Sequence, residues 1–539
     1  MVVQRQPSLR CWGQYGIIFR VMNAKSGSRH KIVILNYGSQ YTQLIARRIR
    51  EQRVYSEILP FTTSAGSLKA DMPQGIILSG GPSSVFDEGA PSIDPEIFNL
   101  GVPVLGVCYG MQLMCHTLGG KVVPSDNREY GKTLMTTSAV SPLIAGLPRE
   151  STVWMSHGDM VSAIPDGFAT VASSANCPFA AIANEARRLY AIQFHPEVVH
   201  TEFGGQIIKN FLFSICACHQ DWNMGSWIDA TIERMRSEVG DGEVILGLSG
   251  GVDSSVVAVL LDKAIGSRLH CIFVDNGLLR HNEVADVENM FRSRLGLDLH
   301  VARAAQRFYA ALKGVEDPEA KRKIIGREFI TVFAEEARKF KSCKFLAQGT
   351  IYPDVIESSS SKDGPSQTIK SHHNVGGLPP DLKFTLVEPL RDLFKDEVRN
   401  VGRLLGMDSA FLDRQPFPGP GLGVRILGEV TEEKVRMLQE ADVRVQEEVR
   451  KLPEYKTIWQ AFAVLLPCRS VGVMGDQRTY EYTCAVRAVN SIDAMTADWT
   501  RIPYDTLATI SNRIINEVHG INRVVYDISS KPPATIEWE

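Results

Sequence analysis

The sequence predicts an α/β protein of several domains, in which apolar strands and helical segments alternate along most of the chain. One alternation begins near residue 31 and a second near residue 222, and each predicts a mostly parallel sheet covered by helices on both faces. From about residue 415 a charged helix is mixed with β-branched and aromatic segments, which predicts a smaller α+β domain. A length of 539 residues agrees with this division at roughly 150 residues per domain.

The first domain is predicted over residues 31–221, after an unassigned tail at 1–30 that shows no clear periodicity. Short runs of apolar residues indicate buried strands, and longer mixed segments indicate helices. In chain order we expect strands at 32–35, 75–78, 102–107 and 189–194, and helices at 41–53, from 111 onwards and at 203–216.

The second domain is predicted over residues 222–414 and the third over 415–539. In the second domain we expect helices at 227–239 and 254–264 and strands at 244–248, 270–274 and 344–348. Residues 358–380 are rich in Ser, Gly, Pro and His, which predicts a long loop of the kind that often serves as a lid.

Composition and charge exclude several classes of protein. The 58 basic and 61 acidic residues leave a net charge of −3, so nothing global favours nucleic acid as a partner. The ten cysteines form no CxxC pair, which disfavours zinc ribbons and favours a reducing cytoplasm. No run approaches the roughly eighteen apolar residues of a membrane span, and no secretory signal is visible.

The first motif with a chemical function combines Cys108 with the segment His195-Pro196-Glu197. Gly106 to Gly110 place the thiol on a tight turn from a strand into a helix, where the partial positive charge of the helix N-terminus favours the thiolate. In an extended segment, side chains two residues apart share one face, so Glu197 can orient His195 as the base. A lone cysteine in an apolar run is usually a core residue, but the combined motifs favour a nucleophile.

These residues, together with the loop Ser79-Gly80-Gly81-Pro82, resemble the class I glutamine amidotransferases over about residues 31–220. The resemblance implies a flavodoxin-like domain that hydrolyses glutamine through a thioester and releases ammonia. Backbone N–H groups of Tyr109 and the loop Gly80-Gly81 are candidates for an oxyanion hole. Gln112 and the segment 156–159 match the substrate side of the family, although His157 could equally be an ordinary loop histidine.

A second motif is Ser249-Gly250-Gly251-Val252-Asp253-Ser254-Ser255, between a predicted strand and a predicted helix. Backbone N–H groups of a glycine loop and a helix N-terminus form a cradle for anions. Asp253 can help to hold a magnesium ion that bridges phosphates. The spacing differs from that of a Walker A loop.

The motif resembles the PP-loop of the N-type ATP pyrophosphatases, which have a doubly wound sheet. The resemblance implies that the loop binds the pyrophosphate released when ATP adenylates a carbonyl oxygen. Val274 and Asp275 end the next predicted strand at the edge expected to contact adenosine, although Asp275 could instead cap a turn. Lys395 is a candidate for stabilising the α-phosphate, although a lysine on a predicted helix is often only solvated.

From about residue 30 to 539 the chain resembles the glutamine-hydrolysing GMP synthetases. The strings that carry the resemblance are NYGSQYTQLIARRIRE, SGGVDSS, KSHHNVGGLP, PFPGPGLGVR and KPPATIEWE. It implies an ATP-dependent ligase that converts xanthosine 5′-monophosphate (XMP) to GMP with nitrogen from glutamine. It also implies Mg²⁺ with ATP, no tightly bound organic cofactor, and a C-terminal domain that forms a homodimer. By resemblance, the residues assigned to XMP are Arg322, Asp476, Lys531 and Glu537.

Alternative interpretations remain at this point. Other PP-loop enzymes make NAD or asparagine, but those relatives carry different glutaminase domains. A tRNA-modifying PP-loop protein is disfavoured by the net charge of −3 and the lack of CxxC pairs. An inactive interaction protein is disfavoured because Cys108, His195, Glu197 and Asp253 are all present.

Overall fold

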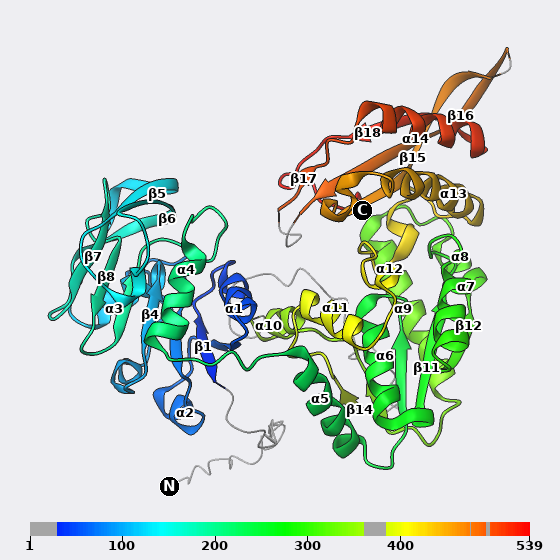
Figure 1. Cartoon of the computed structure of the whole chain (residues 1–539). Coiled ribbons are helices and arrows are strands. Elements are labelled where there is room, and N and C mark those ends of the chain that lie inside the picture. The colour runs from blue at the N-terminus through cyan, green and yellow to red at the C-terminus, as the bar shows by residue number, and fades with distance from the viewer. Residues whose placement is uncertain (1–29, 361–383, 475, 492–495) are drawn as a thin grey trace, which may run out of the picture. The chain divides into compact units, whose positions relative to one another are not determined.

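The computed structural model describes residues 30–360, 384–474, 476–491 and 496–539 (Figure 1). The chain divides into two compact units, Met1–Trp222 and Asn223–Glu539. The tail predicted before His30 lies outside the described residues, as does the KSHHNVGGLP string at 370–379.

The first unit is built on a sheet of nine strands in the order β2-β1-β3-β4-β9-β8-β7-β5-β6. Strands β2, β1, β3, β4 and β9 are parallel neighbours, and their order is that of flavodoxin-like sheets. The remaining pairs are antiparallel. The strands are β1 (Lys31–Asn36), β2 (Tyr55–Pro60), β3 (Gly75–Leu78), β4 (Val104–Val107), β5 (Lys121–Thr137), β6 (Glu150–Ala163), β7 (Ala169–Ser174), β8 (Ala181–Asn184) and β9 (Leu189–Ile192).

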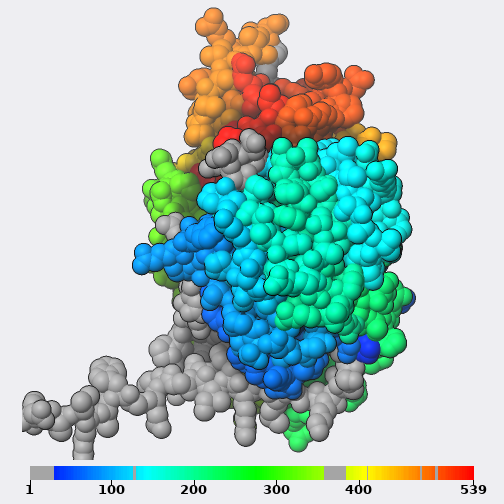
Figure 2. Space-filling model, turned by 90° about the vertical axis from the view of Figure 1, so that its left-hand side faces the viewer, coloured from blue at the N-terminus to red at the C-terminus, as the bar shows by residue number. Residues whose placement is uncertain are grey.

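The strands that the sequence predicted in this sheet are buried runs, although the fully buried β8 was not predicted. Every residue of β3, β4 and β9 is buried, as expected for parallel strands with helices on both faces. Strand β6 instead alternates between buried and partly buried positions along its first half, and no element was predicted for β5 or β6. The helices are α1 (Thr42–Glu51), α2 (Ala65–Ala70), η1 (Pro95–Asn99), α3 (Tyr109–Thr117), η2 (Pro142–Ile144), α4 (Gly204–Lys209) and η3 (Asn210–Ile215). The unit forms one continuous body in the space-filling view, coloured blue to green (Figure 2).

The second unit begins with a parallel sheet in the order β12-β11-β10-β13-β14. In chain order this is 3-2-1-4-5, a doubly wound arrangement whose switch point lies between β10 and β13. The strands are β10 (Val244–Leu248), β11 (Leu269–Asp275), β12 (Asp298–Arg303), β13 (Phe345–Ala347) and β14 (Thr385–Val387).

The helices around this sheet include one that shortens the predicted loop. Helix α10 continues to Ser360, so the first three residues of the segment 358–380 are helical, and the rest of that segment lies outside the described residues. The helices are α5 (Met224–Val239), α6 (Val252–Ile265), η4 (Gly266–Arg268), α7 (Glu283–Val287), η5 (Glu288–Arg294), α8 (Ala305–Leu312), α9 (Pro318–Ala337), α10 (Tyr352–Ser360), α11 (Lys395–Leu404) and α12 (Ser409–Leu412).

The rest of the second unit is a small α+β layer. The strands β15 (Gln460–Met474) and β16 (Gln477–Asn490) form a long antiparallel hairpin, which β17 (Asp498–Trp499) and β18 (Ile521–Asp527) extend. The sequence predicted one charged helix here, whereas the structure has two α-helices, α13 and α14, besides two short helical turns. The helical elements are η7 (Gly421–Val424), α13 (Glu432–Val449), η8 (Pro453–Thr457) and α14 (Tyr504–Glu517). One apolar core joins this layer to the parallel sheet, because Leu278 and Phe308 belong to the same buried cluster as Val435 and Ala463.

Candidate active sites

Cys108 lies on a strained turn between β4 and α3. Its backbone angles are φ 52° and ψ −107°, in a region that non-glycine residues rarely adopt. A Cβ at Gly106 would lie 2.7 Å from the carbonyl oxygen of Gly110, and a Cβ at Gly110 would lie 2.4 Å from that of Leu78. Only glycine therefore fits at either position. Such strain is kept where the surrounding structure enforces it, and here it places the thiol at the N-terminus of a helix.

His195 lies next to this thiol and is paired with Glu197. The imidazole Nδ1 is 2.7 Å from Glu197 Oε1, and both side chains are almost fully buried. Burial lowers the pKa of His195, but the Glu197 charge and a hydrogen bond with Cys108 outweigh it, so the pKa is raised well above its usual value. The backbone N–H of Cys108 donates to Ile192 at the end of β9, which joins the turn to the segment that carries His195. The three side chains have the arrangement of nucleophile, base and orienting acid.

The loop after β3 lies against these side chains. A Cβ at Gly80 would lie 3.1 Å from Cε1 of His195 and 3.6 Å from Cβ of Cys108. A Cβ at Gly81 would lie 2.6 Å from the carbonyl oxygen of Tyr37. The Tyr109 hydroxyl donates to the Pro91 carbonyl at 2.6 Å, so its side chain is held away from the thiol. The backbone N–H of Tyr109 belongs to the first turn of α3, where no carbonyl of the same helix accepts a hydrogen bond from it.

Gln112 takes part in a buried polar network that includes one residue absent from the sequence prediction. Its Nε2 donates to the Asp159 carbonyl at 2.9 Å and approaches Gln193 Oε1 at 3.5 Å. Gln193 is fully buried, and its Nε2 lies 3.8 Å from the sulfur of Cys108. The signal for Gln193 was available, because it is a polar residue in an apolar strand run two positions before His195, and so on the same face.

His157 is also part of this region, with a partner that the sequence analysis did not name. Its Nδ1 lies 3.0 Å from the Asp159 carbonyl and its Nε2 lies 3.4 Å from Glu129 Oε2. Both side chains are buried. Burial lowers the pKa of His157 and outweighs the opposing effect of Glu129. The two residues face each other across the β5–β6 pair, and their pairing could not be read from local periodicity.

The motif that begins at Ser249 forms a turn between β10 and α6. Gly250 has φ +73° and Gly251 is the N-cap of α6. The hydroxyls of Ser249 and Ser254 lie 3.0 Å apart, and that of Ser255 donates to the Gly251 carbonyl at 2.7 Å. With Val252 and Asp253 starting the helix, the turn presents backbone N–H groups at the carboxyl end of β10, beside the switch point.

A second loop closes on this turn from the neighbouring strand. A Cβ at Gly349, which follows β13, would lie 3.1 Å from the backbone nitrogen of Ser254. The turn after β10 and the loop after β13 therefore pack together at the switch point, and the sequence analysis did not single out Gly349.

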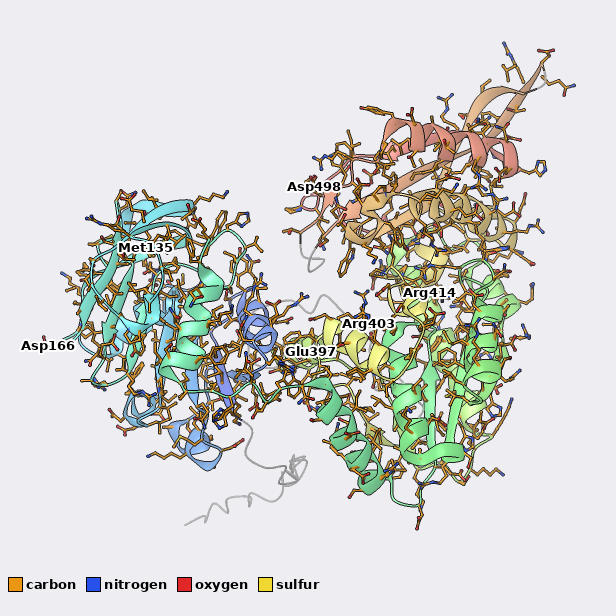
Figure 3. The ribbon with its side chains drawn as sticks, viewed as in Figure 1. Met135, Asp166, Glu397, Arg403, Arg414 and Asp498 are labelled. Atoms are coloured by element: carbon orange, nitrogen blue, oxygen red, sulfur yellow. The ribbon has the colours of Figure 1, made fainter. Side chains whose placement is uncertain are left out.

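Asp253 and Lys395 come together although they are far apart in the sequence. Lys395 Nζ lies 2.5 Å from Asp253 Oδ2, while Asp253 Oδ1 is shielded from solvent and has no hydrogen-bond partner among the described residues. Lys395 begins α11, and Glu397 in the same turn (Figure 3) accepts a hydrogen bond from the backbone N–H of Phe394 at 2.8 Å. An orphaned buried carboxylate oxygen beside an anion cradle fits the oxygen ligands that Mg²⁺ prefers.

Val274 and Asp275 occupy the end of β11. The side chain of Val274 is buried in the apolar core. Asp275 Oδ1 accepts a hydrogen bond from the backbone N–H of Gly277 at 3.1 Å, so this carboxylate does cap a turn. Capping does not engage its Oδ2, which lies 3.9 Å from Arg303 Nη1.

The C-terminal residues form a buried charged cluster with two arginines that the sequence analysis did not name. Arg425 donates to both carboxylate oxygens of Glu537, at 3.0 and 2.9 Å, and is almost fully buried. Arg487 donates to the carbonyls of Ile536 and Thr535, each at 2.7 Å. The string PFPGPGLGVR ends in Arg425, so the sequence drew attention to this arginine. It did not predict that Arg425 pairs with Glu537, which lies 112 residues away.

The other residues assigned to XMP are divided between two regions of the unit. Lys531 pairs with Ala497 through two backbone hydrogen bonds, at 2.7 and 3.0 Å, and Arg322 donates to the carbonyl of Glu539. Asp476 instead lies at the exposed turn between β15 and β16. Glu537 contacts Gln460 at the opposite end of β15, about 46 Å away for fourteen steps of about 3.3 Å. One chain therefore does not bring Asp476 to Glu537.

In the part of the chain that the structure describes, no helix has both the length and the apolar character needed to cross a membrane.

Comparisons with known proteins match three family models to three separate parts of the chain, one in the first unit and two in the second. A model for class I glutamine amidotransferases matches residues 33–215, and a model for NAD synthase matches 226–321. A model for the C-terminal domain of GMP synthases matches 447–538.

Full-length relatives are similar over nearly the whole chain. A glutamine-hydrolysing GMP synthase of Brachyspira hyodysenteriae is 60% identical, over 94% of this chain and 99% of its own. Another, from Maridesulfovibrio salexigens, is 58% identical over 95% of this chain and 99% of its own. The solved structure of a glutamine amidotransferase from Thermotoga maritima is 18% identical, covering 40% of this chain and 86% of its own with a TM-score of 0.27.

Proposed function

The chain belongs to the family of glutamine-hydrolysing GMP synthases, and we propose that its two units divide the synthesis of GMP from XMP between them. The first unit releases ammonia from glutamine, and the second activates XMP with ATP and joins the ammonia to it. The observation that carries this assignment is that one chain holds both a strained Cys108 beside a buried His195–Glu197 pair and a PP-loop with Asp253 beside Lys395.

In the first unit, Cys108 is proposed as the nucleophile that attacks the carboxamide carbon of glutamine. The raised pKa of His195 favours the imidazolium, which keeps the sulfur as thiolate and donates the proton that the departing ammonia needs. Backbone N–H groups of Gly81 and Tyr109 are proposed donors to the oxyanion. Water then hydrolyses the thioester, with His195 as base, and glutamate leaves.

In the second unit, the C2 carbonyl oxygen of XMP is proposed to attack the α-phosphate of ATP. This bond turns a poor leaving group into AMP and releases pyrophosphate into the N–H groups of the turn Ser249 to Ser255. Lys395 is proposed to stabilise the charge that develops on the α-phosphate. Mg²⁺ bound with ATP would neutralise phosphate charge, and Asp253 is its proposed ligand, because Oδ1 is buried and has no hydrogen-bond partner among the described residues. Ammonia then attacks C2, and AMP leaves.

The XMP site is proposed at the C-terminal cluster. Lys531 and Arg322 supply positive charge for the nucleotide phosphate, and Glu537 is held in place by Arg425. Because Asp476 lies at the far end of the hairpin, it can reach such a site only from a second copy of the chain. We therefore propose a homodimer formed through the C-terminal layer. A cytoplasmic location is proposed because all nine described cysteines are free thiols.

The test of this function is a comparison of two nitrogen sources. Cys108→Ala should abolish GMP formation from XMP, ATP and glutamine but leave synthesis from added ammonia near the wild-type rate, as followed by the absorbance change on XMP consumption. The second unit does not need the thiol when ammonia is supplied. If the folded variant loses both activities, or keeps the glutamine-dependent one, the division of labour between the units is wrong.

A further inference from the structure

Three metal-binding side chains meet at the edge of the second unit's parallel sheet that lies opposite the PP-loop. Glu243 directly precedes β10, His270 is the second residue of β11, and Cys343 lies two residues before β13. They converge because the parallel register aligns Val244 of β10 with the first residues of both neighbouring strands. From Glu243 to Ser249 is six steps along the strand, about 20 Å at ~3.3 Å per residue, so this edge is remote from the ATP site.

The distances between the ligand atoms match a tetrahedral zinc site. His270 Nε2 lies 3.6 Å from Glu243 Oε2, and Cys343 Sγ lies 3.7 Å from the same oxygen. With Zn–N and Zn–O bonds of about 2.0–2.1 Å and Zn–S of about 2.3 Å, a tetrahedron has N···O edges of about 3.3 Å and S···O edges of about 3.6 Å. These two pairs therefore need to move by only a few tenths of an ångström, and all three ligand atoms lie within 4.8 Å of one another.

The other ring nitrogen of His270 is held as it is in metal-binding histidines. Its Nδ1 lies 2.6 Å from Asp298 Oδ2, the residue directly opposite it on β12. A proton on Nδ1 that is donated to a carboxylate leaves the lone pair of Nε2 directed at Glu243 and Cys343. Phe340 stacks on the imidazole with ring centroids 4.8 Å apart, which fixes the ring plane.

The surroundings of the three side chains allow an ion to enter. The side chains of His270 and Glu243 are 17% and 35% exposed, whereas Cys343 is buried. Burial and the neighbouring Glu243 raise the pKa of the Cys343 thiol to about 12.

We propose that Glu243, His270 and Cys343 bind one Zn²⁺ ion, with Asp298 positioning the imidazole and solvent at the fourth position. The ion would tie the segment before β13 to the first residues of β10 and β11. Ser342, which donates to Glu243, and Phe340 already fasten the same segment to these two side chains. Its position at the amino ends of the strands, opposite the PP-loop, makes it a structural site.

Cobalt is the probe that tests the ligands directly, because a thiolate bound to Co²⁺ gives a charge-transfer band in the near ultraviolet. The full-length protein, chelator-treated and kept reduced, should bind one equivalent of Co²⁺ with this band, and Zn²⁺ should remove it. Cys343→Ser should abolish the band, and His270→Ala should abolish stoichiometric binding. Asp298→Asn should weaken affinity by about 10- to 100-fold, as loss of a partner that orients a ligand does.

Matched variants separate this site from other thiols and imidazoles. Cys468→Ser removes an exposed cysteine and His281→Ala an exposed histidine, and both should keep the band. Cys177→Ser removes the thiol of a second group, with Glu129 and His157, and Cys108→Ala removes the proposed nucleophile. Ammonia-dependent GMP formation reports that the second unit of each variant is folded, and Glu243→Gln, which removes a third ligand, should also weaken Co²⁺ binding. A band that survives in Cys343→Ser, that disappears in any of the four matched variants, or that never forms would overturn the proposal.

Discussion

Replacing Glu197 by glutamine tests the electrostatic role proposed for the pair His195–Glu197. The substitution keeps the size of the side chain and a hydrogen-bonding group 2.7 Å from Nδ1, but it removes the negative charge from a site where both side chains are at most 4% exposed. Two unit charges about 4 Å apart interact by about 4 kcal/mol at an effective dielectric constant near 20. Removing the Glu197 charge withdraws up to about that much stabilisation from the imidazolium, so the pKa of His195 should fall.

The sign of the effect on activity follows from which form of His195 is needed. The imidazolium holds the thiolate and protonates ammonia, so activity is present below the pKa of His195 and is lost as the pH rises through it. In Glu197→Gln the pKa is lower, so this loss moves to lower pH. At pH 8 we expect glutamine-dependent GMP formation to fall about 100-fold or more, with ammonia-dependent synthesis unchanged.

Two assays check this reasoning. Initial rates with glutamine and with ammonia are measured between about pH 6 and 9, and the rate of Cys108 alkylation by iodoacetamide is measured over the same range, because only the thiolate reacts. Cys468→Ser is the control for alkylation of the exposed thiol. An alkaline limb at the same pH in wild type and Glu197→Gln, with equal glutamine-dependent rates, would show that the Glu197 charge does not set the state of His195.

Further predictions concern the turn at Cys108, the PP-loop and the C-terminal hairpin. Gly110→Ala should lower the free energy of unfolding of the first unit by about 1–3 kcal/mol or more in urea titrations, because its Cβ would lie 2.4 Å from the Leu78 carbonyl. The control is Gly205→Ala, whose Cβ meets nothing within 4 Å and which should be neutral or stabilising. Equal effects of the two substitutions would contradict the packing argument. Lys395→Gln should lower GMP formation about 100-fold with either nitrogen source while glutamate release persists, and a defect confined to glutamine would remove Lys395 from the ATP site. Val473→Asp, at a 72% exposed position of β15, should shift sedimentation from dimer to monomer, and an unchanged dimer would exclude this hairpin from the interface.

The sequence predicted the first unit's parallel strands better than its antiparallel ones. The buried runs at 32–35 and 75–78 stand out as unbroken apolar stretches, since both faces of those strands are covered. Strand β6 fully buries only alternate side chains along its first half, so it contains no unbroken apolar run. The second helix of the C-terminal layer, α14, was missed for a related reason, because it buries only Ile510 and Ile514.

The candidate sites were predictable wherever a few consecutive residues create them. Gly106 and Gly110 allow the close backbone contacts of the tight turn that carries Cys108. The spacing of His195 and Glu197 puts their side chains on one face of an extended segment. The turn Gly250-Gly251 followed by α6 is equally local. In each case the cause is local, because backbone sterics and side-chain spacing within a few consecutive residues fix the geometry. The sequence by itself therefore determined these features.

Only the tertiary structure decided which distant groups become partners. Asp253 meets Lys395 across 142 residues, and Arg425 meets Glu537 across 112. Glu243, His270 and Cys343 meet because β10 lies between β11 and β13, an order that local periodicity does not encode. Strand order follows from the packing of whole helices against whole sheets, and small differences in total buried surface decide it, so no single segment carries that information.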